Sequence, residues 1–143
     1  MAVETGQAII VAIYTRLTTD ATLKSLMGGS VSLYRGMAPQ DPTFPYLVHR
    51  LASAGWPFSS TPYWLDVWTY NESPESMDSM VERIRTLLEN WRITTGASEI
   101  GAGRMVYLPE GSGEIPTDNE QVWHYSTAWR IRFVGTRLTG LVG

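Results

Sequence analysis

The segment Thr61–Trp91 constrains the fold of this chain more than any other. It begins with the aromatic-rich run TPYWLDVWTY, which is typical of a β-strand, and passes through a short polar turn into a helical pattern. Apolar residues of the second half recur at helical spacing: Met77, Met80, Val81, Ile84, Leu87, Leu88 and Trp91. Ser73 suits the N-cap of this helix and Pro74 suits its first turn. A strand that leads into a helix without a catalytic group at the junction favours an α+β protein that acts through assembly.

The rest of the chain carries patterns for two more helices and four more strands. Gln7–Leu17 has an apolar stripe at helical spacing. Asp20 suits the N-cap of a short second helix, and the pair Gly28-Gly29 is expected to end it, because glycine accepts the left-handed conformation of a helix C-cap. The strand patterns cover Val31–Arg35, Tyr46–Ala52, Tyr63–Tyr70, Arg104–Leu108 and Val122–Val134.

Three segments rich in proline, glycine and polar residues are expected to be loops: Ala38–Pro45, Ser53–Pro62 and Pro109–Gln121. The strand that follows the last loop is long, since the pattern of Val122–Val134 spans about 43 Å. A compact domain of this size has a diameter of only about 37 Å. We therefore expect this strand to bend, to be interrupted, or to project from the domain and offer its edge to a neighbour.

Composition excludes several classes of protein. A length of 143 residues favours one domain, residues 1–143, and the absence of cysteine excludes disulfides and thiolate metal sites. A net charge of −3 argues against sequence-independent binding of nucleic acid, and no apolar run approaches the length of a membrane span. Lys24 is the only lysine among 11 basic residues, and six Trp and seven Tyr accompany the arginines. Arginine, tryptophan and tyrosine are enriched at protein–protein interfaces.

The sequence shows no pattern that catalysis, a cofactor or a metal ion requires. His49 and His124 lie in predicted strands without a surrounding cluster of carboxylates, so we expect each to face solvent or to be satisfied in the core. Asp66 is expected to share a partly solvated face with Trp64 and Trp68 rather than to act as an acid, because acid–base catalysis usually requires a partner group. The prediction is therefore no enzyme, with no catalytic, cofactor or metal residues.

Two groups of residues are candidates for an interface. Trp56 and Phe58 lie in a Gly/Pro/Ser-rich segment, where large aromatic side chains either anchor a partner or fold back onto the domain. The second group combines an acidic segment with a basic strand. The acidic residues are Glu110, Glu114, Asp118 and Glu120, and Arg130 and Arg132 follow them. The acidic segment is either a solvated loop or a contact for the basic strand of a neighbouring copy, and a contact of that kind generates a ring when its rotation closes.

The order of five segments resembles the tail-completion or tail-terminator proteins of long-tailed bacteriophages. The first is AIYTRLTTDATLKSLMGGSVSLYRG, and PYLVHRL follows the proline-rich segment. The aromatic run WLDVWTY then precedes PESMDSMVERIRTLLEN, and HYSTAWRIRF closes the series. The likeness covers most of the chain and lies in the order and spacing of the segments.

This resemblance implies an α+β fold in which two to three helices pack on a mainly antiparallel sheet, here of about four to five strands. It implies a structural virion protein, assembled in the host cytoplasm, that forms a ring, usually a hexamer, at the head-proximal end of the tail. Its partners are then further copies of itself, the tail-tube protein and the head connector or head-completion protein. DNA only passes through the bore. No enzymatic activity, cofactor or membrane is implied.

Two other functions remain open from the sequence. Another neck component, such as a head-closure or adaptor protein, has a similar fold and composition, and only its binding partner separates it from a tail terminator. A small α+β ligand-binding module is the alternative of a different class, and a monomer with one deep pocket would favour it.

Overall fold

The computed structural model describes residues 2–52, 60–71, 73–93 and 103–133. The helices of this part are α1 (Ala2–Thr18), α2 (Ala21–Leu26) and α3 (Pro74–Leu88). The strands are β1 (Leu33–Arg35), β2 (Tyr46–Leu51), β3 (Ser60–Tyr70), β4 (Arg92–Ile93), β5 (Gly103–Ile115) and β6 (Val122–Phe133). The strands form one sheet in the order β1-β2-β3-β6-β5-β4. All neighbours are antiparallel except the pair β1 and β2.

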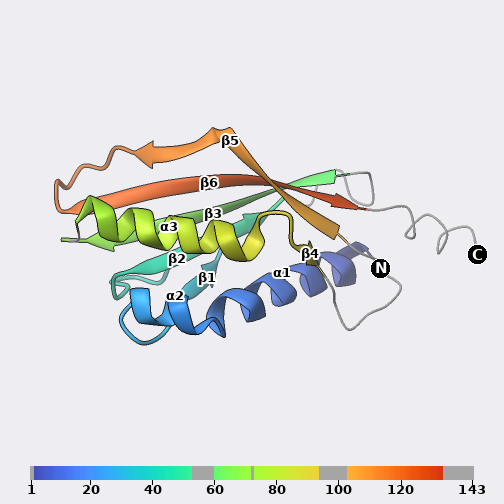
Figure 1. The fold of residues 1–143 in the computed structure, drawn as a ribbon, viewed down its shortest axis with the longest axis horizontal. Helices are drawn as coiled ribbons and strands as arrows, with labels where there is room; N and C mark the ends of the chain where they lie inside the picture. Colours follow the sequence, from blue (N-terminus) through green and yellow to red (C-terminus); the bar gives the residue numbers. More distant parts are fainter. Residues whose placement is uncertain (1, 53–59, 72, 94–102, 134–143) are drawn as a thin grey trace, which may run out of the picture.

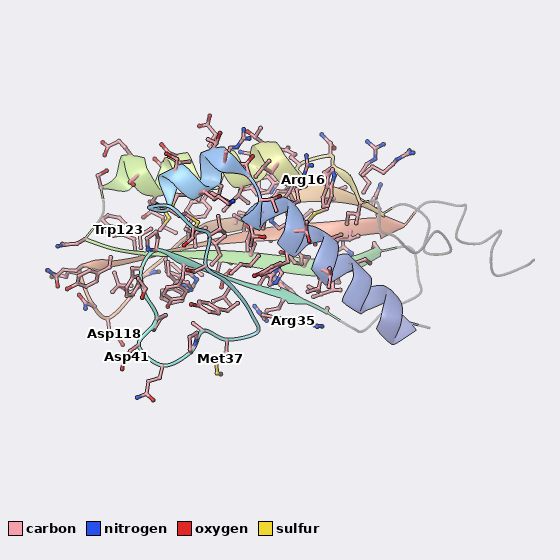
Figure 2. The ribbon with its side chains drawn as sticks, turned by 90° about the horizontal axis from the view of Figure 1, so that it is seen from below. Arg16, Arg35, Met37, Asp41, Asp118 and Trp123 are labelled. Carbon is pink, nitrogen blue, oxygen red and sulfur yellow. The ribbon has the colours of Figure 1, made fainter. Side chains whose placement is uncertain are left out.

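This architecture confirms the expected α+β fold with a mainly antiparallel sheet. The described part contains six strands, because β4 adds a two-residue strand beside β5. Helix α3 lies over the sheet, with α1 and α2 beside it (Figure 1). Figure 2 shows α2 and α3 on one side of the sheet and the segment with Met37 and Asp41 on the other. In the described part of the chain the molecule therefore has two layers, and no helix there covers the second face of the sheet.

The core lies between the helices and the covered face of the sheet. The apolar stripes of α1 and α3 are buried there against the inward side chains of β2, β3, β5 and β6, as the periodicity predicts. The largest fully buried side chains include Trp129, Tyr63, Ile13, Leu65, Met80 and Ile84. Trp91, the last residue of the predicted stripe, lies beyond the end of α3 and packs at the margin of the core. Arg16 of α1 lies over its ring at 4.6 Å and donates to the carbonyl of Leu87 at 2.6 Å.

The predicted N-caps of α2 and α3 are confirmed, whereas α1 begins at Ala2, five residues before the predicted Gln7. Asp20 accepts a hydrogen bond from the backbone N–H of Leu23 at 2.8 Å, and Ser73 accepts one from Ser76 at 3.2 Å. Each satisfies an amide that the first turn of a helix leaves without a partner. The turns on either side of α3 use Asn71 and Asn90, both with positive φ, which asparagine tolerates better than most residues.

Asp20 also joins α2 to α3. Its two carboxylate oxygens accept hydrogen bonds from the guanidinium of Arg83 at 2.9 and 2.7 Å, and this partly buried pair lowers the pKa of Asp20. Replacing Asp20 by alanine removes the cap and the pair together. We expect the free energy of unfolding, measured by urea denaturation, to fall by about 1–2 kcal/mol.

Asn at position 20 is the matched control, because its amide oxygen still accepts from Leu23 while the charge is lost. Asp20→Asn should therefore lose less stability than Asp20→Ala at neutral pH. Equal losses in the two variants would show that capping contributes nothing at this position.

The prediction of a loop over Pro109–Gln121 is wrong. Strand β5 continues to Ile115, and only residues 116–121 connect it to β6. Leu108 lies opposite Ala128 and Gly113 lies opposite Ser126, so four residues of β5 stand between the two paired positions where β6 has one. This bulge absorbs the proline and glycines that indicated a loop, because a strand with a free outer edge tolerates both. Figure 1 shows the bend of β5 along its length.

The hydroxyl of Ser112 closes the bulge. It accepts a hydrogen bond from the backbone N–H of Ala128 at 2.9 Å and donates to the carbonyl of Leu108 at 2.9 Å. A side chain thus replaces part of the ladder that the extra residues interrupt. Gly111 is needed here for space, because a Cβ at this position would lie 3.0 Å from the Cβ of Ala128.

The last strand does not offer a free edge. β6 is an interior strand that pairs with β3 from Val122 to Arg132 and with β5 on its other side. The expectation of an edge that projects to a neighbour is therefore wrong. The length estimate assumed a sphere, whereas the described part is elongated along its strands (Figure 1).

Candidate interface on the open face of the sheet

Alternation along the strands sorts side chains between the two faces of the sheet. On β3, Tyr63, Leu65 and Val67 are fully buried beneath the helices. Trp64, Asp66 and Trp68 point to the opposite face and are half-buried, as the sequence predicts for these three residues. We call this second surface, which no described helix covers, the open face. Cross-strand register divides it into rows about 7 Å apart.

The first row is aromatic and lies near the connection between β5 and β6. Tyr46, Trp68, His124 and Ile115 occupy directly opposite positions on four neighbouring strands. The Trp68 ring stacks on Tyr46 with centroids 6.0 Å apart and on His124 with centroids 3.8 Å apart. Phe44 packs on Tyr46 at 5.1 Å. This end of the open face is a packed aromatic surface, and burial raises the pKa of the Tyr46 phenol.

The second row is polar. Ser126 donates a hydrogen bond to Oδ1 of Asp66 at 2.7 Å. Nε2 of His124 lies 3.2 Å from Oδ2 of the same carboxylate, although no described residue completes a hydrogen bond to this buried nitrogen. Protonation of His124 would make this contact an ion pair.

The opposite end of the open face carries a row of arginines. Arg92 pairs with Arg104, and Arg104 pairs with Arg132, so three guanidinium groups belong to directly opposite positions of β4, β5 and β6. Arg130 lies two residues before Arg132 and donates to Oγ of Ser60 at 3.0 Å. These four exposed residues are called the arginine row below.

The arginine row has no intramolecular counter-charge in the described part of the chain. The ion pairs there join other residues, namely Arg83 with Asp20 and Arg85 with Glu89, and the carboxylate of Asp66 lies beside His124. Like charges directly opposite each other across a sheet destabilise it. An anionic partner would remove this repulsion, so the arginine row is the part of the open face best suited to bind one.

Acidic residues gather at the other end of the β5–β6 hairpin. Glu114, Asp118 and Glu120 are exposed at or beside the turn, and we call them the acidic tip. Glu114 and Glu120 line an open pocket of about 420 Å³ whose wall includes Trp123 and His124. Figure 2 places Asp118 and Trp123 at the same end of the molecule.

The structure thus separates the predicted interface residues into three places. Glu110 is exposed within the bulge of β5, apart from the acidic tip. Arg130 and Arg132 belong to the arginine row, as their exposure on β6 shows. Trp56 and Phe58 lie outside the described residues and stay a prediction.

Sequence reasoning missed Arg92, Arg104 and Trp123 as site residues. Alternation indicated which face Arg104 and Trp123 occupy, but the arginine row depends on register across strands. The bulge shifts the register of β5 against β6, so counting outward from the turn does not place Arg104 opposite Arg132. The two-residue β4, which brings in Arg92, leaves almost no sequence pattern.

His49 is a residue of the core. His49 is buried on the helix side, where Nδ1 forms a hydrogen bond with the Tyr63 hydroxyl at 2.7 Å. Burial, with a smaller effect of Arg35, lowers the pKa of His49 to about 4. His49 is therefore buried in the core with a hydrogen-bond partner, which is one of the two environments expected from the sequence. Within the described ranges, no group of His, Asp and Glu side chains is arranged to hold a metal ion.

None of the helices in the described ranges has the length and apolar character that crossing a membrane requires.

Comparison with known proteins identifies the family. The sequence profile of the family described as "Tail completion protein gp17" matches residues 11–133. A chain from the virion of a native gene transfer agent particle has a similar fold, with a TM-score of 0.69, 16% identity, and coverage of 90% of this chain and 96% of that one. The bacteriophage SPP1 gp17 protein is similar with a TM-score of 0.59, 14% identity and coverage of 92% of both chains. No curated protein matches the sequence. The chain belongs to the tail completion protein gp17 family and is a structural protein of the bacteriophage tail.

Proposed function

We propose that this protein forms a ring, most simply a hexamer, at the head-proximal end of the tail. The ring ends growth of the tail tube and joins the tail to the head connector. The protein acts through shape and surface charge, without catalysis or a cofactor. DNA passes through the bore without being held, in keeping with the net charge of −3.

The observation that carries this proposal is the family match over residues 11–133, which spans the second half of α1, all of α2 and α3, and the whole described sheet. The surface described above supports it. A chain with a bare sheet face, a basic row at one end and an acidic tip at the other has two different surfaces for contacts with neighbours. Contacts between different surfaces of identical copies build rings or filaments.

Capping of tail tubes tests the proposal. Purified protein is mixed with assembling tail-tube subunits of the same phage, and the products are imaged by negative-stain electron microscopy. We expect tubes of limited length with one ring at one end, and a six-fold species in native mass spectrometry. Tubes that grow at an unchanged rate with bare ends, together with a monomeric protein, would refute the ring.

The head-side partner is tested separately. Capped tubes are incubated with purified connector rings and then with connector rings lacking the head-completion protein. If the capped tubes join to connector rings in either mixture, the face of the ring that points away from the tube is the face that binds the head side. A protein that binds connectors but leaves tube growth unchanged would be an adaptor rather than a terminator.

A further inference from the structure

We propose that the arginine row of each copy receives the acidic tip of the next copy, so that the ring closes through one repeated head-to-tail contact. This inference rests on the proposed ring and names the surfaces that build it. Arg92, Arg104, Arg130 and Arg132 supply one side of the contact. Glu114, Asp118 and Glu120, around the pocket that Trp123 lines, supply the other.

The two surfaces do not neutralise each other within one copy. His124 lines the pocket and Arg132 lies eight residues further along β6, which places the surfaces about 27 Å apart. The Debye length is about 8 Å at physiological ionic strength, so their attraction across one copy is screened. Each surface therefore keeps its charge for an outside partner.

Side chains, rather than an added strand, make this contact. The outer edge of β5 carries the bulge with Pro109, and β1 at the other edge has only three residues. Bulges, proline and short strands all hinder the pairing of an edge with another chain. Partners must then be recognised by the open face and by the hairpin end.

The pocket in the acidic tip has the chemistry of a guanidinium receptor. Glu114 and Glu120 offer carboxylate oxygens, and Trp123 offers an aromatic surface in the same wall. Arginine binds carboxylates through its planar fork of donors and stacks on aromatic rings, as Arg50 does on Trp64 at 4.6 Å on the open face. An exposed arginine of the neighbouring row fits this description.

A second copy is favoured over DNA as the partner of the arginine row. The chain supplies three carboxylates in the acidic tip for four guanidinium groups in the row, so each copy carries the complement of its own binding surface. A nucleic-acid site would need a basic footprint over more of the surface, whereas the net charge is −3.

The decisive test uses two variants of the protein, one with the charges of the acidic tip reversed and one with the charges of the arginine row reversed. One variant reverses the tip, Glu114→Arg with Glu120→Arg, and the other reverses the row, Arg92→Glu with Arg104→Glu and Arg132→Glu. All five side chains are exposed. Reversing Arg92, Arg104 and Arg132 together keeps like charges opposite each other, so the repulsion within the sheet is unchanged in sign. Circular dichroism and thermal melting of each variant check that it folds.

Each variant alone should lose the ring, because tip and row then carry the same sign. We expect the concentration for half-assembly to rise by about tenfold or more at low salt in native mass spectrometry. An equimolar mixture should restore six-fold rings in which the two variants alternate, since each tip then meets a row of opposite charge. Glu75→Arg with Glu82→Arg, on exposed residues of α3, makes the same net-charge change as the tip variant and should leave the ring intact.

Three outcomes would overturn the inference. Rings that persist in either variant alone would show that the contact lies elsewhere. A mixture that stays dissociated although both variants fold would show that the two surfaces do not meet. Intact rings in the row variant, combined with loss of binding to a short DNA duplex, would assign the arginines to DNA. A wild-type protein that forms no ring even on tail tubes would instead defeat the proposed function itself.

Discussion

Replacing Trp129 by alanine is expected to lower the free energy of unfolding by about 3–5 kcal/mol, the largest effect of any single substitution considered. Trp129 is the largest fully buried side chain and lies at the middle of β6. Its ring meets Tyr107 edge-on at 5.0 Å, and its Nε1 donates to Oγ1 of Thr127 at 2.8 Å. Alanine leaves a cavity that the surrounding strands cannot close, because they are fixed by their own pairing.

Urea denaturation of the wild type and variant measures this loss. Trp129→Phe is the matched control, since it keeps an aromatic ring against Tyr107 but loses the hydrogen bond and part of the volume. We expect it to lose clearly less stability than the alanine variant. The Thr127 hydroxyl still donates to the carbonyl of Leu65 at 2.7 Å in both variants, so neither leaves it without a partner. A loss below about 1 kcal/mol for Trp129→Ala would contradict the description of this core.

Lowering the pH from 7 to 4 is expected to cost about 3 kcal/mol of stability through His49 alone. The pKa of His49 is about 4 in the folded protein and is near its ordinary value of 6.5 in the unfolded chain. Above pH 6.5 both states are neutral at this residue, and the protein has its full stability. As the pH falls from 6.5 toward 4, only the unfolded chain binds the proton, so unfolding becomes easier.

His49→Gln tests this assignment, because the amide still forms a hydrogen bond with the Tyr63 hydroxyl but does not titrate. The difference in unfolding free energy between wild type and variant, followed from pH 7 to pH 4, should change by the stated amount in favour of the variant. Asp20 does not confuse the result. Its lowered pKa contributes stability that is lost only as the pH falls below its ordinary value of 3.8. A constant difference across this range would disprove the role of His49.

Local chemistry predicted the helices and the faces of the strands. Asp20 and Ser73 act as caps because the first turn of any helix needs acceptors, and this rule depends on neighbours in sequence only. The alternation of β3 placed Asp66 with Trp64 and Trp68 for the same reason. The resemblance to tail-terminator proteins depended on the order of such elements and is confirmed at the level of the family.

The bulge, the arginine row and the pocket could not be predicted from the sequence, because each depends on contacts between residues far apart in the chain. Pro109, Gly111 and Gly113 carry the local signature of a loop, and only pairing with β6 shows that they form a bulge. The arginine row can be recognised only when the register of β4, β5 and β6 is known, because its members are neighbours across strands and not along the sequence. The pocket at the acidic tip likewise depends on where the shortened connection of residues 116–121 brings its side chains.

The interior position of β6 has a consequence for synthesis on the ribosome. β3 is synthesised about sixty residues before its partner β6. Until residues 122–133 emerge, the backbone groups of β3 that face β6 have no hydrogen-bond partner in this strand. The hydrogen-bond ladder at the centre of the sheet cannot form until residues 122–133 have left the exit tunnel. A nascent chain stalled before this point exposes the long flank of β3 as an edge that other chains can pair with.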